Sequence, residues 1–281
     1  MFKRVLVAMD FSEPAMELFN SVPDLKKLGL EELLLVHAVR VELGEQEGIS
    51  PVKQKFLNKV KKNKSQLEQE GLRVDIEIPV GAAAKEIKRL AEERNVDLIL
   101  IGAIGESSRV RELFLGSTVA DVIRTAPVPV LVEKYIAEEK QARRIPIFKD
   151  KLATVLLPTD FSTSAQHVYN ELLKFADTLQ KVIFLYVIDQ GDTEEKVQKM
   201  EQEAREHLNN WAVRFQEKNV ETEIEVKTGN PGQQIIATSE DATLVAMSRR
   251  GRGRLAGLLI GSTADQVIRR GNRPVLLFGK K

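Results

Sequence analysis

The 281-residue chain contains no cysteine, so disulfide bridges, thiolate chemistry and cysteine-based metal sites are excluded. It also lacks any apolar run of about 18 residues, the length at which a helix can span a membrane. Its start, MFKRVLVAMDFSEPA, holds only a short apolar stretch and does not have the pattern of a signal peptide. We therefore expect a cytoplasmic protein that has no membrane partner.

The chain also has no excess of positive or negative charge. Lys and Arg number 42 and Asp and Glu number 41, which gives a formal net charge of +1. This balance argues against nucleic acid as a partner, because its phosphates require a basic face. No GxxxxGK[ST] motif occurs, and efficient phosphoryl transfer needs a positioned lysine, a carboxylate that holds Mg²⁺ and a base. We expect a protein that is not an enzyme, with slow ATP hydrolysis left open.

Two internal repeats show that the chain contains a duplicated domain. Residues 5–15 read VLVAMDFSEPA and residues 155–165 read VLLPTDFSTSA; residues 116–131 read GSTVADVIRTAPVPVL and residues 261–276 read GSTADQVIRRGNRPVL. The matches come in the same order at nearly the same offset, and the length also suits two domains of about 150 residues. We predict a first domain over 1–135, a polar linker over 136–150 and a second domain over 151–281.

Each copy alternates short apolar runs with longer amphipathic stretches. In the second copy, runs rich in Val, Ile and Leu predict strands buried on both faces of a parallel sheet, at residues 154–158, 182–188, 223–227, 244–247 and 275–278. Apolar residues three or four apart predict one helix stripe, made by Val197, Met200, Ala204, Leu208, Trp211 and Phe215. This alternation is typical of a doubly wound α/β domain. In the first copy, Pro23 predicts a kink or break in the first helix.

The residues that suggest a function follow strands, where such sheets bind their ligands. Asp10 and Asp160 end the first strand of each copy, and Ser12 and Ser162 follow as predicted helix N-caps. Residues 248–263 read SRRGRGRLAGLLIGST and lead from the fourth strand into a helix. Glycines with positive φ, a helix N-terminus and arginine side chains would together suit the phosphates of a nucleotide.

The glycine pattern G-x2-G-x9-G-[ST], the strand ending in Asp-Phe-Ser and the strands ending in HAV or YVI resemble the universal stress protein family over nearly the whole chain, twice. The resemblance implies a five-stranded parallel sheet of order 3-2-1-4-5 in each copy, with an adenine nucleotide between strands one and four. It also implies ATP or AMP as the ligand, with or without Mg²⁺, pairing of the two halves or a homodimer, and an unidentified protein partner.

The family pattern assigns nucleotide-binding positions residue by residue. In the second copy they are Thr159, Asp160, Val187, Met247, Ser248, Gly251, Arg252, Gly261, Ser262 and Thr263. In the first copy they are Met9, Asp10, Ala38, Ile101, Gly102, Gly105, Gly116, Ser117 and Thr118.

Neither copy matches the glycine pattern fully. The second copy has Ser248 in place of the first glycine but keeps the spacing. The first copy has one extra residue between Gly105 and Gly116, and Glu106 would place a negative charge beside the phosphates. We therefore expect the second copy to be the better site and the first to hold a shorter nucleotide such as AMP, or none.

Three functions fit these patterns: an adenine-nucleotide-binding regulatory stress-response protein, which we favour, a ligand-free interaction protein of the same fold, and a slow ATPase or phosphotransferase. Simpler interpretations also exist for single residues. Asp160 could cap the following helix, Ser262 and Thr263 could be ordinary N-caps, and the arginines at 249–254 could form a solvated loop or contact RNA. The three histidines, at 37, 167 and 207, share no metal-ligand spacing, so we assign them no chemistry.

Overall fold

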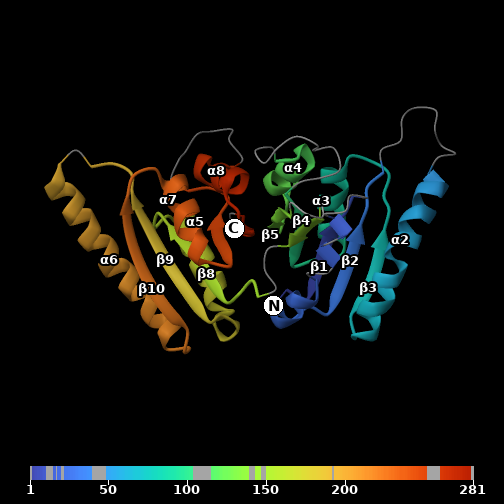
Figure 1. The fold of residues 1–281 in the computed structure, drawn as a ribbon, viewed down its shortest axis with the longest axis horizontal. Helices are drawn as coiled ribbons and strands as arrows, with labels where there is room; N and C mark the ends of the chain where they lie inside the picture. Colours follow the sequence, from blue (N-terminus) through green and yellow to red (C-terminus); the bar gives the residue numbers. More distant parts are fainter. Residues whose placement is uncertain are drawn as a thin grey trace. The chain divides into compact units, whose positions relative to one another are not determined.

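The computed structural model describes residues 2–10, 15–16, 18–19, 22–39, 49–103, 115–138, 143–146, 150–191, 193–251 and 260–279. These residues form two compact units, Met1–Pro146 and Ile147–Lys281. Each unit is an α/β domain built on five parallel strands, as predicted (Figure 1). Among the described helices, none combines the length and apolar character that crossing a membrane requires.

The first unit contains a five-stranded sheet in the order β5-β4-β1-β2-β3. Its strands are β1 (Arg4–Ala8), β2 (Glu32–Val36), β3 (Arg73–Glu77), β4 (Leu98–Gly102) and β5 (Val130–Glu133). Its helices are η1 (Val22–Leu28), α2 (Ile49–Gln69), α3 (Ala83–Glu93) and α4 (Ser117–Thr125). Numbered within the unit, the strand order is 3-2-1-4-5, and all four pairings are parallel.

The second unit repeats this topology with the order β10-β9-β8-β11-β12. Its strands are β8 (Thr154–Thr159), β9 (Lys181–Ile188), β10 (Glu221–Thr228), β11 (Leu244–Ser248) and β12 (Val275–Phe278). Its helices are α5 (Thr163–Leu173), η3 (Ala176–Thr178), α6 (Glu194–Gln216), α7 (Pro231–Thr238), η4 (Ser239–Asp241) and α8 (Ser262–Arg270). The parallel pairing of β8 with β11, Leu244 opposite Val155, forms the switch point of the sheet.

Burial explains why these runs form a two-layered core. The inner strand β8 is buried from Val155 to Thr159, because helices pack on both faces of the sheet. Right-handed crossovers place α5 and α6 on one face and α7 and α8 on the other. On α6 the predicted stripe is buried from Ala204 to Phe215, whereas Val197 and Met200 at its start are only half-buried.

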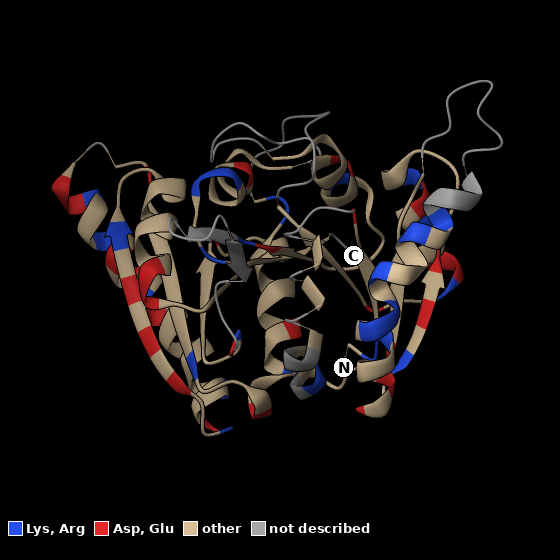
Figure 2. Ribbon diagram, turned by 45° about the vertical axis from the view of Figure 1, so that its right-hand side comes forward, with Lys and Arg blue, Asp and Glu red and all other residues tan. Residues whose placement is uncertain are grey.

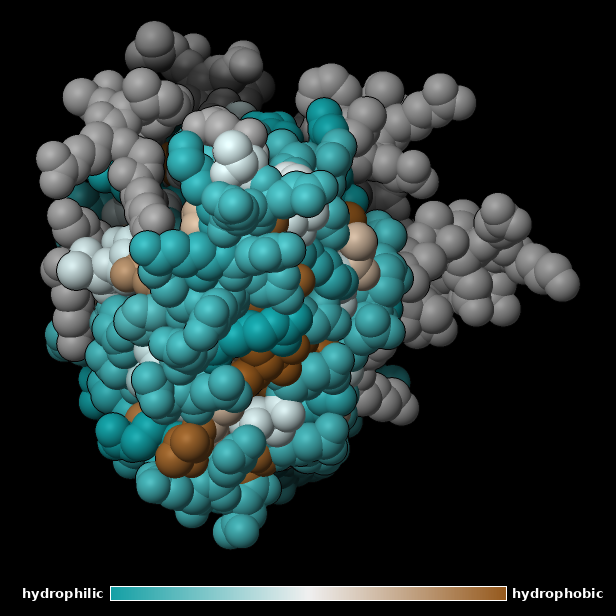
Figure 3. Space-filling model, turned by 90° about the vertical axis from the view of Figure 1, so that its left-hand side faces the viewer, coloured by the Kyte–Doolittle hydropathy of each residue, from teal (hydrophilic) through white to brown (hydrophobic). Residues whose placement is uncertain are grey.

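The outer elements of the second unit are polar. Charged side chains gather on α6 and on β10, where Lys181 of β9 pairs with Glu221 and Glu223 (Figure 2). The face seen in Figure 3 is mostly hydrophilic, with small hydrophobic areas. Val213 of α6 is an exposed apolar side chain. Charges of this kind on an edge strand oppose pairing with further strands.

Two segments differ from the rest of the repeat. Pro23 lies in the 3-10 helix η1, whereas the second unit has the α-helix α5 at the matching place. The segment expected to be a linker includes most of an antiparallel hairpin of β6 (Tyr135–Glu138) and β7 (Arg143–Pro146). The hairpin belongs to the first unit, so the division between units falls after Pro146. Nothing in the polar composition of this segment had indicated strands.

Candidate functional site

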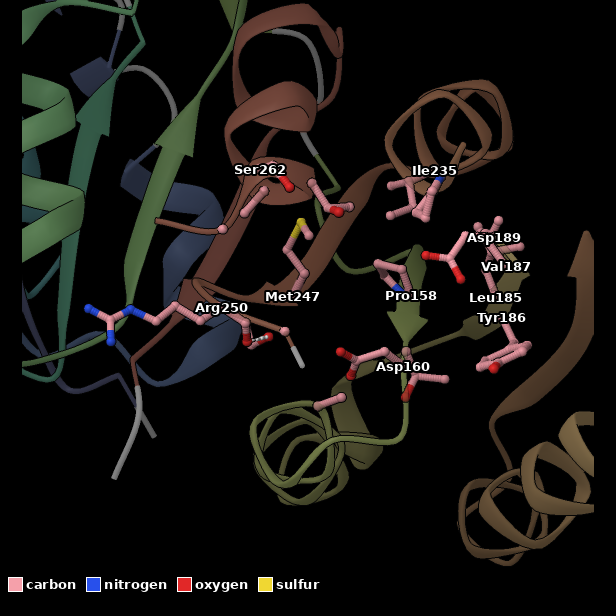
Figure 4. A pocket seen from close by; sticks show the side chains of 18 of the residues that line it. Pro158, Asp160, Leu185, Tyr186, Val187, Asp189, Ile235, Met247, Arg250 and Ser262 are labelled. Carbon is pink, nitrogen blue, oxygen red and sulfur yellow. Dashed lines mark hydrogen bonds between the residues drawn. The ribbon is translucent and has the colours of Figure 1, made fainter. Parts of the chain in front are cut away.

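A cavity of about 350 Å³ opens at the carboxyl ends of β8, β9 and β11 in the second unit (Figure 4). The N-terminal ends of α7 and α8 complete its wall. The nine predicted positions of this copy that the structure describes all line it: Thr159, Asp160, Val187, Met247, Ser248, Gly251, Gly261, Ser262 and Thr263. The tenth, Arg252, lies outside the described residues. The fold therefore brings together residues that are up to 104 positions apart, Thr159 and Thr263.

The turn from β8 into α5 holds Asp160 in place through local hydrogen bonds. The Thr159 hydroxyl accepts from the Phe161 N–H at 2.9 Å, and Asp160 Oδ1 accepts from the Ser162 N–H at 3.0 Å. The Ser162 hydroxyl then accepts from the Ala165 N–H at 3.2 Å and caps α5. Ser162 is thus the N-cap, as predicted, and Asp160 is not. Its counterpart Ser12 lies outside the described residues.

Phe161 has a φ of 55°, a left-handed conformation that is unfavourable for a bulky residue. Its ring packs against Tyr186, His207 and Trp211, with centroid distances of 5.0, 5.1 and 5.7 Å. These aromatic contacts offset the backbone strain. The strained residue directly follows Asp160, so the aromatic cluster also determines where the carboxylate lies.

At Gly251 the backbone passes very close to the Asp160 side chain. A Cβ atom at this position would lie 2.6 Å from Asp160 Oδ2, closer than two such atoms can approach. We had expected the glycines of this loop to provide positive φ angles. That expectation was wrong for Gly251 and Gly261, since neither is among the described residues with positive φ, and Gly261 has a φ of −69°.

The N-terminus of α8 faces the cavity with groups that can bind an anion. The N-cap of α8 is Gly261, which has no side chain that could accept a hydrogen bond from the first turn. Ser262 and Thr263 are the first two residues of the helix itself and are therefore not caps. Their N–H groups have no partner within the helix, and the helix dipole adds partial positive charge there. The nearby Asp265 carboxylate is bound by Arg269 Nε at 2.9 Å.

Arg249 and Arg250, the two arginines of this loop that the structure describes, do not direct their guanidinium groups into the cavity. The Arg249 side chain is buried beside Gly279, where a Cβ would lie 3.5 Å from its Cζ atom. Burial, and secondarily Arg250, lowers the Arg249 pKa to about 10. Arg250 lines the cavity, but its guanidinium points away from it in Figure 4. Among the described residues, the groups of this cavity that could hold an anion are thus backbone N–H and hydroxyl groups.

Several lining residues were missed by the sequence analysis. Tyr186 and Asp189 come from the end of β9 and just after it, while Pro231 and Ile235 come from α7. Asp189 could have been found, because it is the first charged residue after a buried strand that ends at the ligand-binding edge of the sheet. Ile235 could not have been found in this way, because the packing of α7 decides which face of the helix points to the cavity.

The first unit arranges its counterparts in the same way. Met9 and Asp10 follow β1, and Ala38 follows β2. Ile101 and Gly102 end β4, which pairs in parallel with β1. Gly116 is the N-cap of α4, and Ser117 and Thr118 are its first two residues. Gly105 and Glu106 lie outside the described residues.

Histidine has different surroundings in each unit, and none suggests a metal. In the first unit His37 follows β2, with Nδ1 3.0 Å from the Met9 carbonyl oxygen and its ring stacked on Phe56. In the second unit His167 lies 3.7 Å from Glu171, and His207 packs on Phe161. Across the described part of the chain, no three acidic or histidine side chains gather closely enough to hold a metal ion.

Comparison with known proteins agrees with this architecture. The model of the universal stress protein family matches residues 1–134 and 152–279. Universal stress protein MJ0577 of Methanocaldococcus jannaschii is 31% identical over 156 residues, which cover 48% of this chain and 96% of the relative. Universal stress protein YxiE of Bacillus subtilis is 30% identical over 147 residues, covering 47% of this chain and 99% of that protein.

A solved structure spans both units. The crystal structure of a universal stress protein from Archaeoglobus fulgidus has a TM-score of 0.74 and 22% identity, and the match covers 99% of this chain and 96% of that one. At this identity the likeness concerns the fold alone. The two sequence relatives named above match about one unit's length of this chain, whereas the solved structure matches nearly all of it.

Proposed function

Because the chain belongs to the universal stress protein family, we propose that it is a regulatory protein whose second unit binds an adenine nucleotide without efficient catalysis. One observation carries the proposal. Asp160 and the N-terminus of α8 line the same cavity at the switch point of the sheet, and Gly251 lies between them, close to both Asp160 and Gly261. A carboxylate beside unpaired helical N–H groups suits a molecule that has hydroxyl groups at one place and an anionic tail at another.

The phosphates would lie at the N-terminus of α8. The N–H groups of Ser262 and Thr263 and their hydroxyls can donate to phosphate oxygens, and the half-buried Gly261 leaves room for close approach. In the described part of the chain neither hydroxyl is engaged in another hydrogen bond.

The nucleoside would lie along β8, β9 and β11. The half-buried Asp160 can accept hydrogen bonds from ribose hydroxyls, next to Thr159. Met247 and Val187 provide apolar contacts for a base, and the backbone of Val187 offers further hydrogen bonds. ATP, ADP and AMP share this nucleoside, so the phosphate end decides between them. Mg²⁺ would arrive with the phosphates.

Two other functions remain as alternatives. A ligand-free interaction protein would have the same fold with a cavity that no nucleotide occupies. A slow ATPase or phosphotransferase would use Asp160 to help hold Mg²⁺. A nucleotide can regulate this protein only if it binds two states of the protein with different affinity. In the regulatory function proposed here, these two states differ in their association with an unidentified protein partner or with a second chain.

The test is calorimetric titration of the full chain with ATP, ADP and AMP, each with and without Mg²⁺. In Gly261→Glu a carboxylate would enter the position proposed for the phosphates, and we expect a loss of ATP affinity of about 100-fold or more because of charge repulsion. Gly116→Glu places the same side chain at the matching position of the first unit. It should change ATP affinity by about threefold or less.

Each alternative predicts a different result in this titration. Equal losses in the two variants would contradict the ranking of the units. No heat and no thermal stabilisation at millimolar nucleotide would support the ligand-free protein, because a ligand of the native state must raise its stability. Multiple-turnover phosphate release that Asp160→Ala abolishes would support the enzyme.

A further inference from the structure

Helix α2 of the first unit concentrates positive charge that the chain as a whole does not show. It holds six of the 42 basic residues and one of the 41 acidic residues. The helix therefore has a formal charge of +5 and the rest of the chain −4, which together give the net +1. The balance that argued against nucleic acid as a partner is an average, and it does not describe the blue surface of α2 in Figure 2.

The matching helix of the second unit, α6, lacks this excess. It has four basic and five acidic residues, and they neutralise one another in ion pairs such as Lys199 with Glu203 and Arg205 with Glu201. The two helices thus occupy the same place in the repeat and differ in charge. On α2 the six basic residues are all lysines: Lys53, Lys55, Lys59, Lys61, Lys62 and Lys64.

Part of the charge on α2 is unopposed. Lys64 pairs with Glu68, the one acidic residue of the helix sequence, at 3.4 Å. Lys53, Lys61 and Lys62 are exposed and form no ion pair with any residue that the structure describes. A polyanion can therefore approach these three lysines without breaking an existing ion pair.

The exposed face of α2 has a regular pattern around the helix axis. Phe56, Val60 and Leu67 are buried and anchor the helix, which packs on β3 at the edge of the sheet. Successive residues turn by about 100°. The Gln54 amide donates to Asn58 Oδ1 at 3.0 Å, as expected for neighbours on one stripe. The full stripe opposite the buried residues is made by exposed side chains, namely Gln54, Asn58, Lys61, Ser65 and Gln69.

Lysines lie on both sides of this stripe. They are Lys53 and Lys64 on one side and Lys55, Lys59 and Lys62 on the other. The exposed face thus has a centre rich in amide and hydroxyl groups between two positively charged flanks. The helix is about 30 Å long, so the pattern extends over several turns.

This pattern fits the major groove of B-form DNA. The groove is about 12 Å wide and admits one α-helix, whose flanks then face the phosphates of the two strands while its centre faces the base edges. Lysine pairs with phosphate, and amide and hydroxyl side chains can hydrogen-bond to bases. We propose that α2 docks in the major groove of double-stranded DNA. The inference does not depend on the nucleotide site of the second unit.

Two other polyanionic surfaces fit less well. A membrane binds helices that insert apolar side chains among the headgroups. The buried apolar residues of α2 face its own unit, and among its described side chains Leu57 is the one exposed large apolar residue. Double-stranded RNA has a deep, narrow major groove that side chains cannot read.

The experiment measures the fluorescence anisotropy of a labelled DNA duplex of about 20 base pairs during titration with the full chain. We expect a Kd of about 10 μM at about 50 mM salt, and an affinity about tenfold lower for an RNA duplex of the same length. In the double variant Lys61→Gln, Lys62→Gln the DNA affinity should fall about tenfold. The slope of log K against log salt should become shallower by about 2, because two phosphate contacts are lost.

The matched control is the double variant Lys196→Gln, Lys199→Gln, which removes two exposed lysines of α6 and should change neither quantity. Equal losses in the two variants, or no binding of DNA by the unmodified chain, would overturn the inference. Equal affinity for the DNA and RNA duplexes would exclude docking in the groove. Tighter binding to vesicles that contain phosphatidylserine, or to polyglutamate, would assign the lysines of α2 to a membrane or an acidic protein instead.

Discussion

Asp160 is positioned by one contact with a residue close to it in sequence and by another with a residue far along the chain. The Ser162 N–H is two residues away, whereas Gly251 comes from the loop after β11 and lies against the other carboxylate oxygen. The first contact is local, because a short polar side chain readily accepts a hydrogen bond from a backbone N–H two residues on. The second contact requires β8 and β11 to be neighbours, and only the folded sheet provides that.

Replacing Gly251 by alanine tests the Asp160 carboxylate directly. The added methyl group would lie 2.6 Å from Oδ2 and force the carboxylate to move. We expect ATP affinity to fall about tenfold, the size of one lost hydrogen bond to a charged group, with little change in the free energy of unfolding. Calorimetry and urea unfolding measure the two quantities.

Gly116→Ala is the steric control for that variant, since its nearest contact would be Val119 Cγ2 at 3.6 Å, an ordinary van der Waals distance. It should leave ATP affinity unchanged. Wild-type affinity in Gly251→Ala would mean that the Asp160 carboxylate does not contact the ligand.

Helix α5 illustrates how an element begins where its cap allows. Ser162 accepts a hydrogen bond from the Ala165 N–H, and the buried face of the helix follows with Ala165, Val168, Tyr169 and Leu172. The cap and the apolar spacing are both local, which is why the start of this helix was predictable. In the first unit Pro23 replaces the residue that matches Leu173, and the chain forms η1 there. A proline ring removes an N–H donor and so opposes a continuous α-helix.

At this scale we predict that Ser162→Ala lowers the free energy of unfolding by about 1 kcal/mol, the usual loss when an N-cap side chain is removed. Urea unfolding followed by circular dichroism measures this. Thr163→Ala, at the neighbouring exposed first helical position, should change stability by less than about 0.5 kcal/mol. Equal effects of the two substitutions would contradict the capping role.

The molecule as a whole consists of two units with the same strand order. The repeats at 5–15 and 155–165 predicted the duplication, since the same sequence pattern buries the same faces. The residues that line the described cavity all belong to the second unit. Nucleotide binding should therefore be a property of that unit by itself.

We predict that a fragment of residues 147–281 folds and binds ATP with an affinity within about threefold of the full chain. Circular dichroism tests folding and calorimetry tests binding, with a fragment of residues 1–146 as the matched comparison. A folded fragment whose ATP affinity is lower by more than about tenfold would show that the first unit contributes to the site.

The sequence by itself determined the duplication, the strands of the parallel sheets, the capped start of α5 and nine described positions of the cavity, because periodicity, turn chemistry and family motifs are recorded in local spacing. The tertiary structure decided the rest. It buried Arg249, oriented Arg250 away from the cavity, brought Gly251 close to the Asp160 carboxylate and directed Asp189 inward. Side-chain direction and burial arise from contacts between strands that are distant along the chain, and no local pattern records them.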